Sequence, residues 1–191
     1  MSAIESLQQV YGEVENNSIL LEKSVTAPVT EGLGILYASF LALYLQYQKH
    51  HFVVEGSEYH MLHDYFLESS EAAEKHAHDI GERMHGLGSV PATSFAQLSE
   101  LCCFTPTMDD VFRCSEMIKQ NLQAEQSLIE IIRRQASQAE SLGDRATRLL
   151  YEQILLKTEE RAYHLEHFLT RDSLKSRLVS IDRSTLSLKM G

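Results

Sequence analysis

The chain has 191 residues, and no Pro-, Gly- or Ser-rich linker divides it, so we expect one domain with a well-buried core. A formal net charge of −10, with only three prolines and nine glycines, favours an acidic and mainly helical protein whose body would repel nucleic acid. The sequence contains no run of about eighteen apolar residues, no signal-peptide pattern and no cysteine spacing typical of a metal site or a disulfide framework, so a soluble cytoplasmic protein without a membrane partner is expected.

The charge is unevenly distributed along the chain. Residues 171–191 carry a net charge of +3, which leaves −13 on residues 1–170 out of the total of −10. The acidic body would attract small cations, whereas the basic C-terminal tail is the segment that could contact phosphate.

Residues 1–27 are polar and weakly patterned, which predicts an N-terminal tail or an irregular lead-in. From Pro28, interpreted as a first-turn proline, to about Val54 the pattern predicts a first helix. No charged residue occurs between Glu31 and Lys49, so this helix is expected to be covered by its own bundle and by a neighbouring subunit. One stripe at alternating four- and three-residue steps contains Leu33, Tyr37, Phe40, Tyr44, Tyr47 and His51.

A short joint at Gly56 and Ser57 precedes the second predicted helix. Ser57 is expected to cap this helix, which runs to about His85 and is ended by Gly86 and Gly88. So short a joint predicts that the first two helices lie antiparallel. The core stripe of the second helix contains Tyr59, Leu62, Phe66, Ala73, Ala77, Ile80 and Met84.

A connection of residues 86–107 follows, with a short helix expected around Ser94–Cys102. The third helix is predicted from Met108 to about Ser141, with a core stripe of Val111, Ile118, Leu122, Ile129 and Ile132. After a tight joint at residues 142–144, the fourth helix has a stripe of Tyr151, Leu155, Thr158, Ala162, Leu165 and Leu169.

Two helical hairpins joined by one long crossover form the ferritin-like version of the four-helix bundle. The sequence therefore predicts an all-α ferritin-like four-helix bundle over residues 28–170, with a crossover that contains a short helix between the second and third helices. Residues 171–191 are expected to form a C-terminal tail.

The histidines around the first joint suggest a metal site. The antiparallel joint brings His51, at the end of the first helix, near His63, while His78 and Glu82 form an i,i+4 pair on one face of the second helix. His63 and His78 are fifteen residues apart, about 22 Å along a helix, whereas metal–nitrogen bonds are about 2 Å long. One chain cannot close these two half-sites on one ion.

Two chains packed around a twofold axis would join each half-site to the complementary half of the other chain. The result would be two sites per dimer, each with three imidazoles and one carboxylate, a donor set suited to iron or zinc. The alternative is that His51, His63 and His78 are ordinary surface histidines. We expect the other six to be solvated or satisfied inside the protein: His50, His60, His76, His85, His164 and His167. A di-iron site inside the bundle is disfavoured because it needs two Glu-x-x-His motifs, and only residues 82–85 provide one.

Three motifs around these residues resemble those of the Dps family, the miniferritins that oxidise and store iron and in some members coat DNA. The resemblance covers residues 28–170. The family patterns His-Trp-x-Val-x-Gly, Leu-His-x-x-Phe-Asp-Glu and Asp-x-Ile-Ala-Glu-Arg-Ile-x-x-Leu-Gly are matched in order by HFVVEG at 51–56, LHDYFLE at 62–68 and HDIGERMHGLG at 78–88.

Two departures fall on the ligands of the family. Leu67 and His78 stand where aspartates are expected, and Asp79 cannot replace the second because one residue turns it by about 100°. The pattern resembles a cyanobacterial DpsA-like subgroup with a histidine-type ferroxidase centre. Such a site is less anionic, so Zn²⁺ is expected to compete better with iron.

The resemblance implies a ferroxidase whose metal-binding and catalytic residues are His51, His63, His78 and Glu82. It would oxidise Fe²⁺ with O₂ or hydrogen peroxide and store ferric oxide in a hollow dodecamer built from twofold dimers, in the cytoplasm or at the nucleoid. Asp144 is a candidate for the acidic pores, although Arg145 and Arg148 stand beside it. The alternative is a DNA-compacting protein with a structural zinc site, which would bind DNA weakly through its C-terminal tail.

Overall fold

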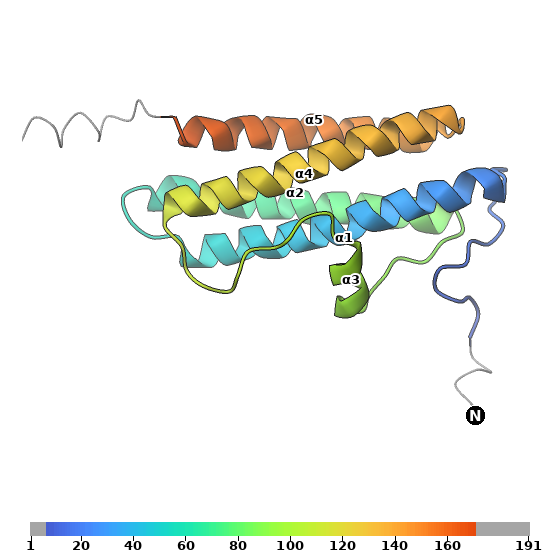
Figure 1. Cartoon of the computed structure of the whole chain (residues 1–191), viewed down its shortest axis with the longest axis horizontal. Coiled ribbons are helices and arrows are strands. Elements are labelled where there is room, and N and C mark those ends of the chain that lie inside the picture. Colours follow the sequence, from blue (N-terminus) through green and yellow to red (C-terminus); the bar gives the residue numbers. More distant parts are fainter. Residues whose placement is uncertain (1–6, 171–191) are drawn as a thin grey trace, which may run out of the picture.

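The computed structural model describes residues 7–170, and these residues form five helices and no strand. The helices are α1 (Lys23–Val53), α2 (Tyr59–Gly86), α3 (Phe95–Leu101), α4 (Cys114–Ser141) and α5 (Arg145–Phe168). The four long helices form a bundle, and the short α3 lies outside it beside α1 (Figure 1). The predicted all-α, ferritin-like architecture is therefore confirmed, whereas the predicted C-terminal tail lies outside the described residues.

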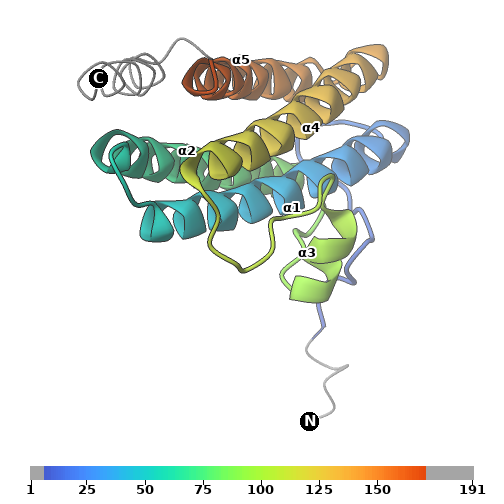
Figure 2. The same ribbon diagram turned by 60° about the vertical axis from the view of Figure 1, so that its left-hand side comes forward.

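Two antiparallel hairpins pack on each other to form the bundle. Helices α1 and α2 make one hairpin and α4 and α5 the other, with α1 in contact with α4 (Figure 2). The core between them contains Leu33, Leu36, Phe40, Tyr47, Phe66, Ile80, Leu128, Ile132 and Tyr151, all at most 1% exposed. All of them except Leu36 and Leu128 lie on the predicted stripes. Tyr59, which the predicted core stripe of α2 included, is 39% exposed, so that part of the prediction is wrong.

Helix α1 is long and apolar enough, by length and composition alone, to cross a membrane. In the bundle it is a central helix, with Leu33, Phe40 and Tyr47 fully buried against the other helices. Packing inside the protein therefore accounts for its apolar sequence.

Helix α1 begins at Lys23, so the predicted start at Pro28 is wrong. The amides of Val25 and Thr26 donate to the carbonyl of Glu22, 2.9 and 3.0 Å away, and the Thr26 side chain is fully buried. Pro28 in the second turn removes only the bond to the carbonyl of Ser24, an exposed residue whose carbonyl water can satisfy. Residues 23–27 thus belong to the helix rather than to a tail.

The segment before α1 is held against the crossover by Gly88. The carbonyl of Gly88 accepts the Glu15 amide at 2.8 Å and the Gln9 side-chain amide at 2.9 Å. Gly88 has a φ of +87°, and a Cβ there would lie 2.4 Å from the Glu15 carbonyl oxygen. The same glycine that ends α2 therefore also allows residues 9–15 to approach it closely.

Two further helix starts differ from the prediction. Glu58 rather than Ser57 is the N-cap of α2, and the Ser57 hydroxyl donates to the Glu58 carboxylate. Helix α4 begins at Cys114 rather than Met108, and Met108 and Val111 are each 68% exposed. The preceding segment is held to α1 by Lys49, which donates to the Met108 carbonyl and lies over the ring of Phe112. These contacts with α1 replace the predicted first turns of the helix.

Candidate metal centre

His51 and His63 lie against each other where α1 turns into α2. Their ring centroids are 3.8 Å apart, and Nδ1 of His51 is 2.9 Å from the carbonyl oxygen of His63. A carbonyl only accepts, so Nδ1 of His51 carries the proton and its Nε2 keeps a lone pair that can bind a metal. The structure thus brings together the two histidines that the joint was predicted to unite.

The second ring has a weaker orienting contact. Nδ1 of His63 lies 3.4 Å from Oδ1 of the exposed Asp64, and both His51 and His63 are half-buried. A carboxylate at this position favours the proton on Nδ1, which leaves Nε2 of His63 as the second lone pair. In this arrangement each ring can offer its Nε2 to a metal.

His78 and Glu82 are exposed on one face of α2, more than four helical turns from His63. Within residues 7–170, no group of three or more His, Cys, Asp or Glu side chains is close enough to hold one ion. The described part of one chain thus presents two separated half-sites. That these four residues bind metal, and that two chains join them, stays a prediction.

The interior of the bundle contains an ion pair that the sequence reasoning missed. Arg161 donates from Nε to Oε1 of Glu125 at 2.6 Å and from Nη2 to Oε2 at 3.1 Å, and Tyr47 donates its hydroxyl to the same Oε1 at 2.8 Å. Glu125 is fully buried, and Arg161 is 7% exposed. Burial, followed by the charge of Glu125, raises the pKa of Tyr47, so its proton stays on the phenol.

Glu125 continues the predicted four- and three-residue steps of α4, between Leu122 and Ile129, so a charge on a core stripe was the signal that could have revealed the pair. A fixed guanidinium now occupies this part of the bundle interior. Its two hydrogen bonds engage both oxygens of the Glu125 carboxylate.

Of the other six histidines, two are buried and four are exposed. The prediction of a solvated or satisfied position holds only in part for His50, whose Nε2 is buried without a hydrogen-bond partner within residues 7–170. His50 and His76 are buried, and burial lowers the pKa of each to about 4, with a smaller contribution from Lys49 for His50 and from Arg161 for His76. His50 contacts the Asn121 side chain at 3.1 Å, and His76 lies edge-on to Phe40. The remaining four histidines, His60, His85, His164 and His167, are exposed.

Comparison with known proteins decides the family. Residues 31–174 match the ferritin-like domain family. The chain is 60% identical over 174 residues to the nutrient stress-induced DNA-binding protein of Nostoc sp., covering 91% of this chain and 95% of the relative. The DNA protection during starvation protein of Halobacterium salinarum is 31% identical over 175 residues, covering 91% and 96%. The chain belongs to the Dps family of ferritin-like proteins.

A solved structure supports the same assignment. The archaeal Dps homologue from Halobacterium salinarum has a TM-score of 0.86 to this chain at 30% identity, covering 88% of this chain and 94% of that one. A further Dps-family relative, the nutrient stress-induced DNA-binding protein of Synechococcus sp., is 53% identical over 169 residues, covering 88% and 96%. The similarity therefore extends over nearly the whole Dps fold.

Asp144 does not fit the pore role that the Dps resemblance suggested. It is 2% exposed, accepts from Nη2 of Arg83 at 2.8 Å and caps α5 by accepting from the Thr147 amide at 3.0 Å. Its charge is neutralised inside its own chain, so the prediction of Asp144 as a pore residue is wrong.

The two departures from the Dps ligand pattern have structural counterparts. Leu67 is half-buried on α2, and Asp79 accepts from Nζ of Lys75 at 2.8 Å. Asp79 is therefore directed toward Lys75 on its own helix. This contact supports the inference that Asp79 does not take the place of the aspartate expected at position 78.

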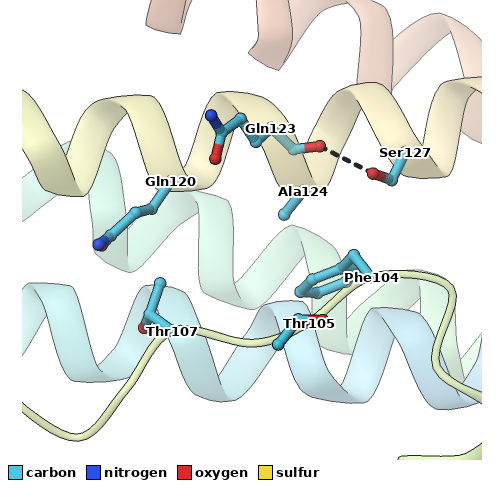
Figure 3. Close-up of a pocket in the computed structure, with 7 residues that line it drawn as sticks. All are labelled: Phe104, Thr105, Thr107, Gln120, Gln123, Ala124 and Ser127. Atoms are coloured by element: carbon cyan, nitrogen blue, oxygen red, sulfur yellow. Dashed lines mark hydrogen bonds between the residues drawn. The ribbon is translucent and has the colours of Figure 1, made fainter.

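A separate cavity of about 280 Å³ lies between the crossover and α4 (Figure 3). The side chains that line it are all uncharged: Phe104, Thr105, Thr107, Gln120, Gln123, Ala124 and Ser127. None of these residues belongs to the predicted metal centre. The lining contains no histidine, cysteine or charged side chain.

Proposed function

We propose that two copies of this chain pair around a twofold axis, and that His51 and His63 of one copy bind Fe²⁺ together with His78 and Glu82 of the other. The assembly then oxidises Fe²⁺ to Fe³⁺ with hydrogen peroxide or O₂ and stores it as ferric oxide. The observation that carries this proposal is the His51–His63 pair, with the His51 Nδ1 proton bound to the His63 carbonyl. This contact orients Nε2 of His51 before a metal arrives.

The donor set suits the chemistry. Three neutral imidazoles and one carboxylate bind Fe²⁺, and the Glu82 carboxylate supplies the negative charge that becomes more favourable as iron reaches the ferric state. Two Fe²⁺ ions together supply the two electrons that one peroxide molecule accepts. Peroxide is then reduced fully, and the reaction releases no hydroxyl radical.

Membership of the Dps family supports a hollow dodecamer, built from such dimers, as the storage vessel. The net charge of −13 on residues 1–170 would raise the local concentration of Fe²⁺ around it. We propose a cytoplasmic protein whose role is to withdraw iron and peroxide together and so protect the cell and its DNA.

The test uses anaerobic loading with Fe²⁺ followed by peroxide. In the double variant His63→Ala/His78→Ala, which removes one ligand from each half-site, we expect the ferric absorbance to rise at least about 10-fold more slowly than in the wild type. The matched control is His164→Ala/His167→Ala, because these two exposed histidines lie outside the predicted centre. Equal rates in the first variant and the wild type would contradict the proposal.

A second candidate function is DNA binding, favoured by the relatives of Nostoc and Synechococcus that are named nutrient stress-induced DNA-binding proteins. In this alternative the metal is a structural zinc ion, and residues 171–191, with their net charge of +3, contact phosphate. A gel-shift assay at low salt, repeated after deletion of residues 171–191, tests the DNA contact. Metal content of the purified protein decides between zinc and iron.

A further inference from the structure

A tyrosine ring extends the histidine pair of the candidate metal centre. Tyr59, the first residue of α2, has its ring centroid 4.9 Å from that of His63, and His63 is 3.8 Å from His51. Tyr59 lies one helical turn before His63 and therefore on the same face of α2. The three rings form a continuous row of tilted contacts that leads from the predicted ligands to Tyr59, which is 39% exposed.

The donor set of the centre bears on how many electrons the bound iron can supply to peroxide. A neutral imidazole has a single lone pair and binds one ion, so among the four predicted ligands only the carboxylate of Glu82 could bridge two ions. Such a centre has few groups to hold a second Fe²⁺ beside the first. One Fe²⁺ supplies one electron, whereas full reduction of peroxide takes two, and the one-electron product is hydroxyl radical.

We propose that Tyr59 supplies this second electron when a single Fe²⁺ is bound. The proposal rests on the function proposed above, with hydrogen peroxide as oxidant. The balanced step is Fe²⁺ + Tyr59-OH + H₂O₂ → Fe³⁺ + Tyr59-O• + H₂O + OH⁻. The O–O bond of peroxide breaks, iron and the phenol each lose one electron, and the phenolic proton ends in the water molecule. An oxidising equivalent that would escape as hydroxyl radical is held on the protein.

Tyr59 is singled out by its contacts. The chain has no tryptophan, and Phe52, which lies edge-on to His51, has no hydroxyl proton to release with an electron. Tyr47 is fully buried, and its hydroxyl already donates to Glu125. Tyr59 alone among these rings combines contact with a predicted ligand and access to water, which can carry the released proton.

The experiment loads the assembled protein with one Fe²⁺ per chain without oxygen, adds one equivalent of hydrogen peroxide, and freezes the sample for electron paramagnetic resonance. The wild type is expected to give a tyrosyl radical signal, and Tyr59→Phe to lose it. A spin trap in parallel samples should report severalfold more hydroxyl radical from Tyr59→Phe. Native mass and circular dichroism establish that this variant still folds and assembles.

Tyr163→Phe is the matched control, because Tyr163 is also an exposed tyrosine packed on a histidine, with its ring 4.1 Å from that of His167. It should keep the wild-type signal. Ferric absorbance without a tyrosyl signal in the wild type, or an unchanged signal in Tyr59→Phe, would overturn the role of Tyr59 while the proposed ferroxidase stands. Absence of any ferric product in the wild type would overturn both.

Discussion

Arg161 and Glu125 place two opposite charges inside the bundle, and each charge is compensated by the other. Burial disfavours the charged guanidinium, but the charge and hydrogen bonds of Glu125 outweigh it and raise the pKa of Arg161 above its usual value. Arg161 also donates to the Thr158 hydroxyl at 3.3 Å, and Tyr47 donates to Glu125. Removal of either charge would leave the other buried and uncompensated.

We therefore expect Arg161→Met to lower the free energy of unfolding by about 3–5 kcal/mol, because the Glu125 carboxylate would remain without its counter-charge. Urea unfolding at one fixed protein concentration measures this loss. Arg133→Met is the control, since Arg133 and Glu159 form a surface pair with side chains 61% and 42% exposed, and it should cost at most about 1 kcal/mol. Addition of Glu125→Gln to Arg161→Met should restore part of the stability. Similar losses in the two single variants would contradict this account.

At the same scale, the sequence allowed the His51–His63 contact to be predicted, because a short joint between two helices fixes which residues meet. It did not allow the Glu125–Arg161 pair to be predicted. Hydrophobic periodicity identifies apolar positions, but it gives no information about which charged residues pair, and these two are 36 residues apart in the chain. Asp144 was misread for a related reason. Its partner, Arg83, lies on another helix 61 residues away along the chain.

The ends of the helices were harder to predict than their existence. The start of α4 differs from the predicted start because Lys49 of α1 holds the segment before it. The starts of α1 and α2 differ through local contacts, the amides of Val25 and Thr26 with the Glu22 carbonyl and the Ser57 hydroxyl with the Glu58 carboxylate. The end of α2 was predicted within one residue, because Gly88 has a positive φ that the sequence can signal. Local chemistry thus predicts a helix end where a glycine is required, whereas a tertiary contact accounts for the later start of α4.

Gly88 offers a test at the level of an element. We expect Gly88→Ala to release residues 9–15 from the crossover, because its Cβ would lie 2.4 Å from the Glu15 carbonyl oxygen and φ is +87°. The cost should be roughly 1–3 kcal/mol. Faster hydrogen exchange of the Glu15 amide, which donates to the Gly88 carbonyl, would report the release. Gly86→Ala is the control, since no atom lies within 4 Å of its Cβ position. Unchanged exchange at Glu15 in Gly88→Ala would argue against this contact.

For the whole molecule, the proposed centre makes assembly a condition of the proposed activity, because its two half-sites are separated on α2. His63 and His78 lie about 22 Å apart along one straight helix, so no local motion of the helix brings them together. A twofold axis that joins the start of one α2 to the far part of another would complete two equivalent centres at once. The activity should therefore be a property of the pair of chains rather than of either chain alone.

Mixed assembly of two inactive variants tests this directly. One variant carries His51→Ala/His63→Ala and the other His78→Ala/Glu82→Ala, so each alone lacks half of every centre. In a mixed dimer one centre combines the two intact halves and the other combines the two damaged halves. Random co-assembly at equal amounts makes half of the dimers mixed and should restore about a quarter of the wild-type ferric absorbance rate. Simple mixing without subunit exchange should restore none. If co-assembled variants stayed as inactive as each parent, the centre could not lie between subunits.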